Sequence, residues 1–266
     1  MKKYLLILLL FIGFSSCNEF QKALKSESVA EKFKFGTQLY EDGKYAKANR
    51  LFVQIVPNYR GKPQAEKLMY MYSKSFYEMK DFYLAGYQFE RFVTSYPKSE
   101  KVEEAAYLSA KSYYLLCPIY TKDQKDTVDA IEKLQVFINT YPESEYISEA
   151  NVMVKELDFK LERKAFEIAK QYNTITDYKA SINSFNNFLL EYPGSILREE
   201  ALYVRSDSAY KLAVNSVEYK KAARLKTAQI YLDSFIGSFP NSDKLQVTKD
   251  MLQEVNNQLE TVNTKS

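Results

Sequence analysis

The chain has 266 residues, a net charge of +3, and neither histidine nor tryptophan. Histidine is the commonest general base and metal ligand in proteins, so its absence argues against most catalytic and metal-binding functions. Seven glycines and seven prolines are too few for a turn-rich β protein or a disordered chain. Because Lys2 and Lys3 belong to an N-terminal leader, the mature chain is nearly neutral, which does not support nucleic-acid binding.

The leader has the pattern of an export signal. Lys2 and Lys3 precede an apolar run from Tyr4 to Phe14, which is too short for the roughly 20 residues of a membrane-spanning helix. Small residues and then Cys17 follow, an arrangement that resembles the lipobox of bacterial lipoproteins. The resemblance implies that residues 1–16 are a signal peptide and that Cys17 carries acyl and diacylglycerol lipid. The alternative is an ordinary secretory leader that is cleaved elsewhere.

The next residues, 17–28, are polar and are expected to form a lipidated tether. Beyond Cys17 the chain has one cysteine, Cys117, so the mature protein has no intramolecular disulfide. Cys117 lies in an apolar run and is expected to be a small buried residue rather than a nucleophile, because no histidine is present to activate it. We expect no cofactor other than the covalent lipid.

One short motif returns along the rest of the chain. Phe92-Val-Thr-Ser-Tyr96-Pro97-Lys-Ser99 recurs at residues 137–144, 188–195 and 235–242, and a weaker copy covers residues 55–62. The residue before proline avoids the helical region, so each motif predicts that one helix ends at the aromatic residue. The serine is a favourable N-cap for the next helix. Five such joints predict a helical repeat protein.

The repeats fit the tetratricopeptide template, a helix-turn-helix unit with a period of about 34 residues. When the joints are aligned, small residues occupy one position of each first helix and one position of each second helix. In chain order these residues are Gly36, Ser73, Ala110, Ala169 and Ser206, and Ala48, Ala85, Ala130, Ser181 and Ala228. Large apolar residues follow on the second helices at helical spacing, as a packed seam requires.

The predicted fold class is therefore an all-α solenoid, an α-α superhelix of about five tetratricopeptide repeats. We assign residues 29–142 to an N-terminal half with three repeats and residues 143–260 to a C-terminal half with two repeats and a capping helix. Residues 148–170 are expected to form one long helix, residues 245–260 the capping helix, and residues 261–266 a frayed tail.

The leader, the repeats and the loop from Cys117 to Thr127 together resemble the BamD family, lipoproteins of the machinery that assembles outer-membrane β-barrels. The resemblance implies a lipid-anchored protein at the periplasmic face of the outer membrane. It also implies that the C-terminal half binds the POTRA region of a BamA-like barrel protein, while the N-terminal half helps to recognise unfolded barrel proteins. On the long helix, Lys160 matches a basic residue that contacts the partner, although Glu162 stands where the family has alanine.

The first helices also carry a row of aromatic and basic side chains that the template places on the concave face. From these we select a tyrosine–lysine face, which comprises Tyr40, Tyr70, Lys74, Tyr77, Tyr107 and Lys111. Tyrosine offers broad contact with a polar tip, and lysine offers a positive charge to a free carboxylate. We expect this face to bind the tails of unfolded outer-membrane proteins. The alternative is that the tyrosines form the core between repeats.

Two other functions remain in competition. Paired carboxylates such as Glu103-Glu104 and Glu199-Glu200 could suggest a glycosidase, but adjacent helical residues point in different directions, and we interpret both pairs as solvated helix starts. The sequence has no nucleotide-binding loop or nucleophile elbow, so we predict that the protein is not an enzyme. The second alternative is another periplasmic repeat adaptor that serves cell-wall synthesis or nutrient uptake.

Overall fold

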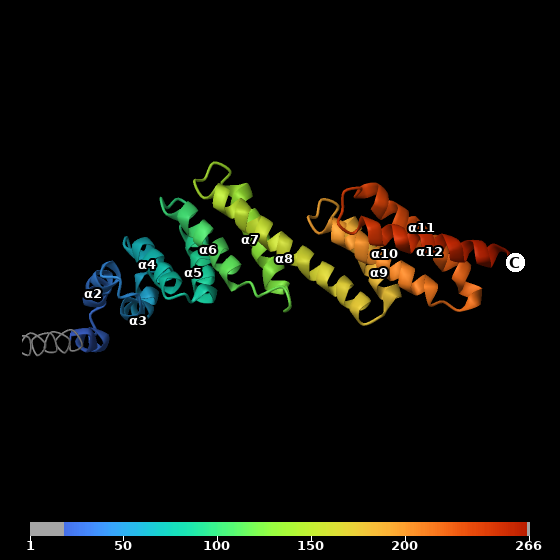
Figure 1. The fold of residues 1–266 in the computed structure, drawn as a ribbon. Coiled ribbons are helices and arrows are strands. Elements are labelled where there is room, and N and C mark those ends of the chain that lie inside the picture. The colour runs from blue at the N-terminus through green and yellow to red at the C-terminus, as the bar shows by residue number, and fades with distance from the viewer. Residues whose placement is uncertain (1–18, 265–266) are drawn as a thin grey trace, which may run out of the picture. The chain divides into compact units, whose positions relative to one another are not determined.

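The computed structural model describes residues 19–264, and all regular secondary structure within them is helical (Figure 1). The predicted all-α fold class is confirmed. No helix among these residues is both long enough and apolar enough to cross a membrane. The elements are α2 (Val29–Glu41), α3 (Tyr45–Ile55), η1 (Val56–Tyr59), α4 (Ala65–Glu78), α5 (Phe82–Ser95), α6 (Val102–Leu116), α7 (Lys125–Thr140), α8 (Ile147–Thr174), α9 (Tyr178–Glu191), α10 (Arg198–Val214), α11 (Glu218–Ser238) and α12 (Leu245–Thr264).

The helices form two compact units. The N-terminal unit contains residues 19–118 and 122–157, and the C-terminal unit contains residues 119–121 and 158–264. The division falls inside α8, whereas the sequence analysis divided the chain after Pro142, at a joint. The reason is that the first turns of α8 pack on the N-terminal unit, where Ala150, Met153 and Leu157 belong to the hydrophobic core.

The small positions predicted from the repeats are all buried. Ala48, Ala85, Ala130, Ser181 and Ala228 on the second helices are each 0% exposed. The large residues that follow them are buried as well, and they include Phe52, Phe89, Leu134, Phe185 and Leu232. A small side chain lets two helices approach closely, and the large one then fills the seam between them. The sequence pattern therefore located the core correctly in every repeat.

The joints end their helices as predicted. Helices α5, α7, α9 and α11 stop directly before Tyr96, Tyr141, Tyr192 and Phe239, whose ψ angles of 60° to 65° leave the helical region. The predicted role of the serines as N-caps is wrong. Ser99 accepts a hydrogen bond from the amide of Lys101, but α6 begins only at Val102, because a short turn intervenes between the proline and the helix.

The ends of two helical segments and the burial of Cys117 differ from the predictions. Residues 19–25 of the predicted tether are helical, and Phe20, only 3% exposed, packs beneath Lys47 and Arg50. Cys117 is half-buried rather than buried. The long helix and the capping helix are confirmed as α8 and α12, but α12 continues through residues 261–264 of the predicted frayed tail. The signal peptide and Cys17 lie outside the described residues.

Candidate functional site: the tyrosine–lysine face

The aromatic rings of the first helices pack on the core of their own repeat. Tyr70 lies edge-on to Phe89 and Phe92, with ring centroids 6.2 and 5.7 Å apart. Tyr107 is only 3% exposed and stacks on Tyr146 at 4.2 Å. The ring of Tyr107 is therefore part of the core, and the half-buried ring of Tyr70 packs against that core within its own repeat.

The second row of tyrosines on this face is half-buried. Tyr40 packs on Tyr45 and Phe52, and Tyr77 lies edge-on to Phe82. The Nζ atom of Lys74 lies 5.0 Å from the centre of the Tyr77 ring, within the range of a cation–π contact. These rings keep part of their surface accessible to solvent, so they offer more contact area to a ligand than Tyr107 does.

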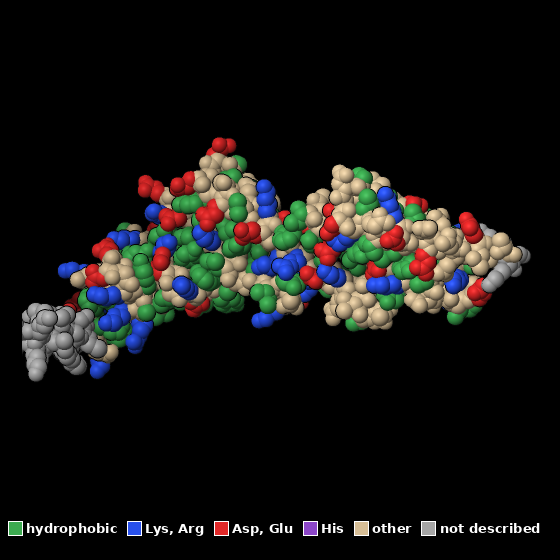
Figure 2. Space-filling model, in the orientation of Figure 1, with side chains coloured by type: hydrophobic (Ala, Val, Ile, Leu, Met, Phe, Trp, Pro, Cys, Tyr) green, Lys and Arg blue, Asp and Glu red, His purple; other side chains and the backbone are tan. Residues whose placement is uncertain are grey.

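Both lysines of the face are already paired with carboxylates. Lys74 lies 3.1 Å from Glu78 on the next turn of α4. Lys111 on α6 lies 2.7 Å from Glu149 on α8 and 3.1 Å from the Tyr107 hydroxyl. A free carboxylate that binds here must therefore compete with Glu78 and Glu149. On the side seen in Figure 2, acidic and basic side chains are interspersed over the N-terminal unit.

Both glutamate pairs lie in the first turns of their helices and are partly exposed, as interpreted, but three of the four glutamates also bind other side chains. Glu104 forms hydrogen bonds with Tyr70 and Lys101. In the C-terminal unit, Glu200 pairs with Lys170 at 2.6 Å, and Glu199 accepts a hydrogen bond from Ser242 at 2.6 Å. Glu199 and Ser242 lie 43 residues apart in the chain. A search for residues at helical spacing does not find contacts over such separations.

The electrostatics keep the face in one protonation state near neutral pH. Burial raises the pKa values of Tyr40, Tyr70 and Tyr107 well above the ordinary value, so their hydroxyls stay protonated. Burial alone would lower the pKa of Lys111, but its contacts with Glu149 and Tyr107 outweigh that effect and raise it. Burial likewise opposes the lowering of the Glu104 pKa, which hydrogen bonds from Tyr70 and Lys101 produce. The hydroxyls of Tyr70 and Tyr107 are thus held in hydrogen bonds with Glu104 and Glu149, among paired charges.

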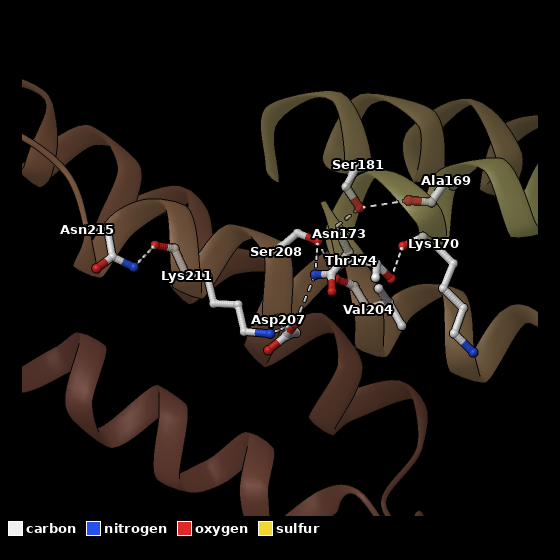
Figure 3. A network of polar contacts seen from close by, with 10 residues as sticks. All are labelled: Ala169, Lys170, Asn173, Thr174, Ser181, Val204, Asp207, Ser208, Lys211 and Asn215. Atoms are coloured by element: carbon white, nitrogen blue, oxygen red, sulfur yellow. Dashed lines mark hydrogen bonds and ion pairs between the residues drawn. The ribbon is translucent and has the colours of Figure 1, made fainter. Parts of the chain in front are cut away.

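The C-terminal unit carries a different polar network at the corresponding first-helix positions (Figure 3). Asn173 donates to Asp207 at 2.9 Å and to Ser208 at 2.8 Å. Lys211 pairs with Asp207 at 2.7 Å, and Ser208 bonds to Ser181 at 3.0 Å. Asp207 is 8% exposed, so its charge is compensated by these partners rather than by water. This network ties α8, α9 and α10 together and is not a second tyrosine–lysine face.

A sequence signal that we missed is a glutamate on a first helix, 33 to 43 residues before a joint serine. The joint serines Ser99 and Ser195 donate hydrogen bonds to Glu66 and Glu162, each 33 residues earlier. With Glu199 and Ser242, the same pairing occurs in three repeats. Glu162 therefore has a structural partner, which gives a physical reason for a glutamate where the BamD family has alanine.

The sequence model of the outer membrane lipoprotein family YfiO matches residues 25–225. The chain belongs to this family. The match starts within the first described helix and extends into α11, so it covers the tyrosine–lysine face and the polar network alike. No curated protein matches the chain.

Lys160, the predicted partner contact of this family member, is half-buried on α8. Nearby on the same helix, the guanidinium of Arg163 lies 4.4 Å from the ring centre of Tyr120, in the loop that follows Cys117. Tyr120 and Arg163 both belong to the C-terminal unit, so this contact fixes part of the loop against α8. The role of Lys160 in binding a partner stays a prediction.

Proposed function

We propose that this outer membrane lipoprotein is a non-catalytic subunit of a β-barrel assembly machinery of the Bam type. In this proposal lipid on Cys17 anchors the protein at the periplasmic face of the outer membrane. The C-terminal half, including Lys160, binds the POTRA region of a BamA-like protein, and the N-terminal half binds unfolded barrel proteins. The observation that carries the proposal is the family match over residues 25–225.

The deciding experiment is co-purification of the lipidated protein after mild detergent extraction of membranes. A barrel protein with POTRA domains should be recovered in a stable complex. A Cys17→Ala variant should leave the membrane fraction, because it lacks the residue that carries the acyl chains and stable anchoring depends on them. Recovery of a cell-wall synthase or a nutrient importer in place of the barrel protein would favour the other periplasmic adaptor function and reject this one.

The tyrosine–lysine face suits an extended peptide with aromatic side chains, since half-buried tyrosine rings lie along it. Outer-membrane strands alternate apolar and polar residues and carry aromatics near their ends. Lys74 and Lys111 would bind the terminal carboxylate after displacing Glu78 and Glu149 from their ion pairs. This binding mode predicts opposite effects for the lysines and for their glutamate partners.

Replacing both Lys74 and Lys111 with glutamate should weaken the binding of a barrel C-terminal peptide by about tenfold, because a charge-assisted hydrogen bond is lost. Glu149→Gln should instead strengthen it, since a competing carboxylate is removed. Fluorescence anisotropy at low salt, with free-acid and amidated forms of one peptide, measures both effects. Equal affinity of the two peptide forms for the unmodified protein would reject recognition of the carboxylate.

A further inference from the structure

The first described residues form a short helix that packs on the N-terminal unit. Residues 19–25 are helical, and Phe20, Ala23 and Leu24 lie on one side of this helix, since they are spaced three and four residues apart. Phe20 belongs to the hydrophobic core of the unit, and Ala23 and Leu24 pack against that core. The segment that the sequence predicted as a tether is therefore largely part of the folded unit.

Two basic side chains of α3 hold Phe20 in place. The Nζ atom of Lys47 lies 5.5 Å from the centre of the Phe20 ring, and the guanidinium carbon of Arg50 lies 5.4 Å from it. Both distances are in the range of cation–π contacts. The aliphatic stems of long basic side chains can cover apolar surface while the charged ends stay in water. With its ring only 3% exposed, Phe20 fixes the short helix against α3.

The solvent-facing side of the short helix is basic. Lys22 and Lys25 are exposed there, beside the two basic residues of α3. We define the N-terminal basic surface as Lys22, Lys25, Lys47 and Arg50. Glu19 is the one carboxylate within residues 19–25 and α3, so these two helices together carry a net charge of +3. Figure 2 shows several basic side chains at this end of the unit.

The N-terminal basic surface is not neutralised by the chain itself. Among residues 19–264, no carboxylate forms an ion pair with any of its four basic side chains. Lys74 and Lys111 differ in this respect, since both are paired with glutamates. An unpaired basic surface attracts anions over about one Debye length, which is about 8 Å at physiological ionic strength.

The distance along the chain from this surface to the proposed lipid anchor is short. Cys17 precedes Phe20 by three residues. An extended chain of three residues spans at most about 10 Å. Lipid on Cys17 is part of the proposed function, and the present inference rests on it. Such a lipid would hold Phe20, and with it the basic side chains around Phe20, close to the phosphate groups of the membrane surface.

We propose that the N-terminal basic surface binds the anionic headgroups of the phospholipids around the anchor. The exposed ammonium and guanidinium groups contact lipid phosphates, while the Phe20 ring stays in the core and fixes their position. A basic patch beside a lipid chain adds electrostatic attraction to the hydrophobic anchoring. The N-terminal unit is thereby held at the membrane surface instead of moving at the end of a free tether.

The test uses the lipidated protein, purified from membranes and reconstituted into vesicles of phosphatidylethanolamine and phosphatidylglycerol. A bimane dye is attached at residue 46, an exposed position beside Lys47, through Ala46→Cys in a Cys117→Ser background. A phospholipid with a nitroxide on its headgroup should quench this dye strongly. The same dye on Val128→Cys, at an exposed position of α7, should be quenched much less. High salt should reduce the quenching at residue 46, because it screens exposed charges.

Reversing two charges of the surface should release the unit from the membrane. Lys22→Glu/Lys25→Glu should lower the ratio of docked to undocked protein by at least about 25-fold, since each lysine near an anionic membrane contributes about fivefold. Lys98→Glu/Lys155→Glu is the matched control. It makes the same change in charge at two exposed lysines of the N-terminal unit that lie outside the basic surface, so it should leave the quenching unchanged.

A third variant tests the role of the short helix. Phe20→Ala keeps all four basic side chains but removes the ring that fixes residues 19–25 against α3. The chain between Cys17 and α2 then becomes a longer flexible connection, so the quenching at residue 46 should fall. The result of Lys22→Glu/Lys25→Glu stands even if Phe20→Ala disturbs the core, because both lysines are exposed.

The outcomes distinguish this inference from the proposed function. A protein that does not sediment with the vesicles would refute the lipid anchor and this inference with it. Sedimentation without quenching at residue 46 would refute the basic surface alone. Equal quenching in vesicles of phosphatidylcholine would reject recognition of anionic headgroups, as would equal effects of the two double variants. Quenching that requires an added partner protein would indicate an acidic protein surface in place of the lipid.

Discussion

Replacing Phe188 with alanine should lower the free energy of unfolding of the C-terminal unit by about 3–5 kcal/mol. Phe188 is 1% exposed on α9, and its ring packs on Phe166 at 5.7 Å and on Tyr192 at 5.3 Å. Removing the ring leaves a cavity at the seam of a repeat, which α9 and α10 cannot close without breaking the joint between them. Urea unfolding followed by circular dichroism gives the change in free energy.

Leu190 provides the matched control for this prediction. It lies on the same helix two residues further on, but it is 83% exposed. Leu190→Ala should change the free energy of unfolding by no more than about 0.5 kcal/mol. Hydrogen exchange should show that Phe188→Ala weakens the protection of α9 and α10 first, since repeats unfold through their nearest neighbours. Similar losses for the two variants would contradict the assignment of Phe188 to the core.

Gly36→Ala is expected to destabilise the N-terminal unit even though alanine favours helices. A Cβ at this position would lie 2.7 Å from Cε1 of Phe52 and 3.5 Å from Cβ of Leu51. Phe52 is 0% exposed, so its ring has no free space into which to move. Overpacking costs about 1–3 kcal/mol, which exceeds the roughly 0.5–1 kcal/mol that alanine contributes to a helix.

Gly237 on α11 is the control, because the expected change in stability on substitution by alanine has the opposite sign. No atom lies within 4 Å of a Cβ added there, so Gly237→Ala should stabilise the protein by up to about 1 kcal/mol. Thermal and urea unfolding of both variants, measured side by side, give the two signs. Stabilisation by both substitutions would show that α2 and α3 are less tightly packed at Gly36 than the structure indicates.

The sequence predicted the small positions and the joints because both follow from local rules. A proline excludes its preceding residue from the helix, and the closest approach of two helices admits only a small side chain. The prediction failed for Ser99 as an N-cap, because its backbone forms turn hydrogen bonds with Tyr96 and Val102 before the helix begins. Residues 19–25 were missed as a helix because their apolar contact, Phe20 beneath Lys47 and Arg50 of α3, is distant in the chain.

The candidate site was predicted less completely than the fold. The sequence selected Lys74 and Lys111, and it places Glu78 one helical turn from Lys74, a spacing at which an ion pair is expected. It did not show that Glu149 neutralises Lys111. Lys111 and Glu149 lie 38 residues apart, and their meeting depends on the length of the loop after Cys117 and on where α8 begins. A pattern search within one repeat cannot see a pair that spans two repeats.

By itself, therefore, the sequence determined the repeat register, the helix ends and the buried seam of this outer membrane lipoprotein, since each depends on residues close together in the chain. The tertiary structure decided that Lys111 pairs with Glu149 and that the joint serine Ser99 bonds to Glu66. Those features arise where side chains from separate helices meet.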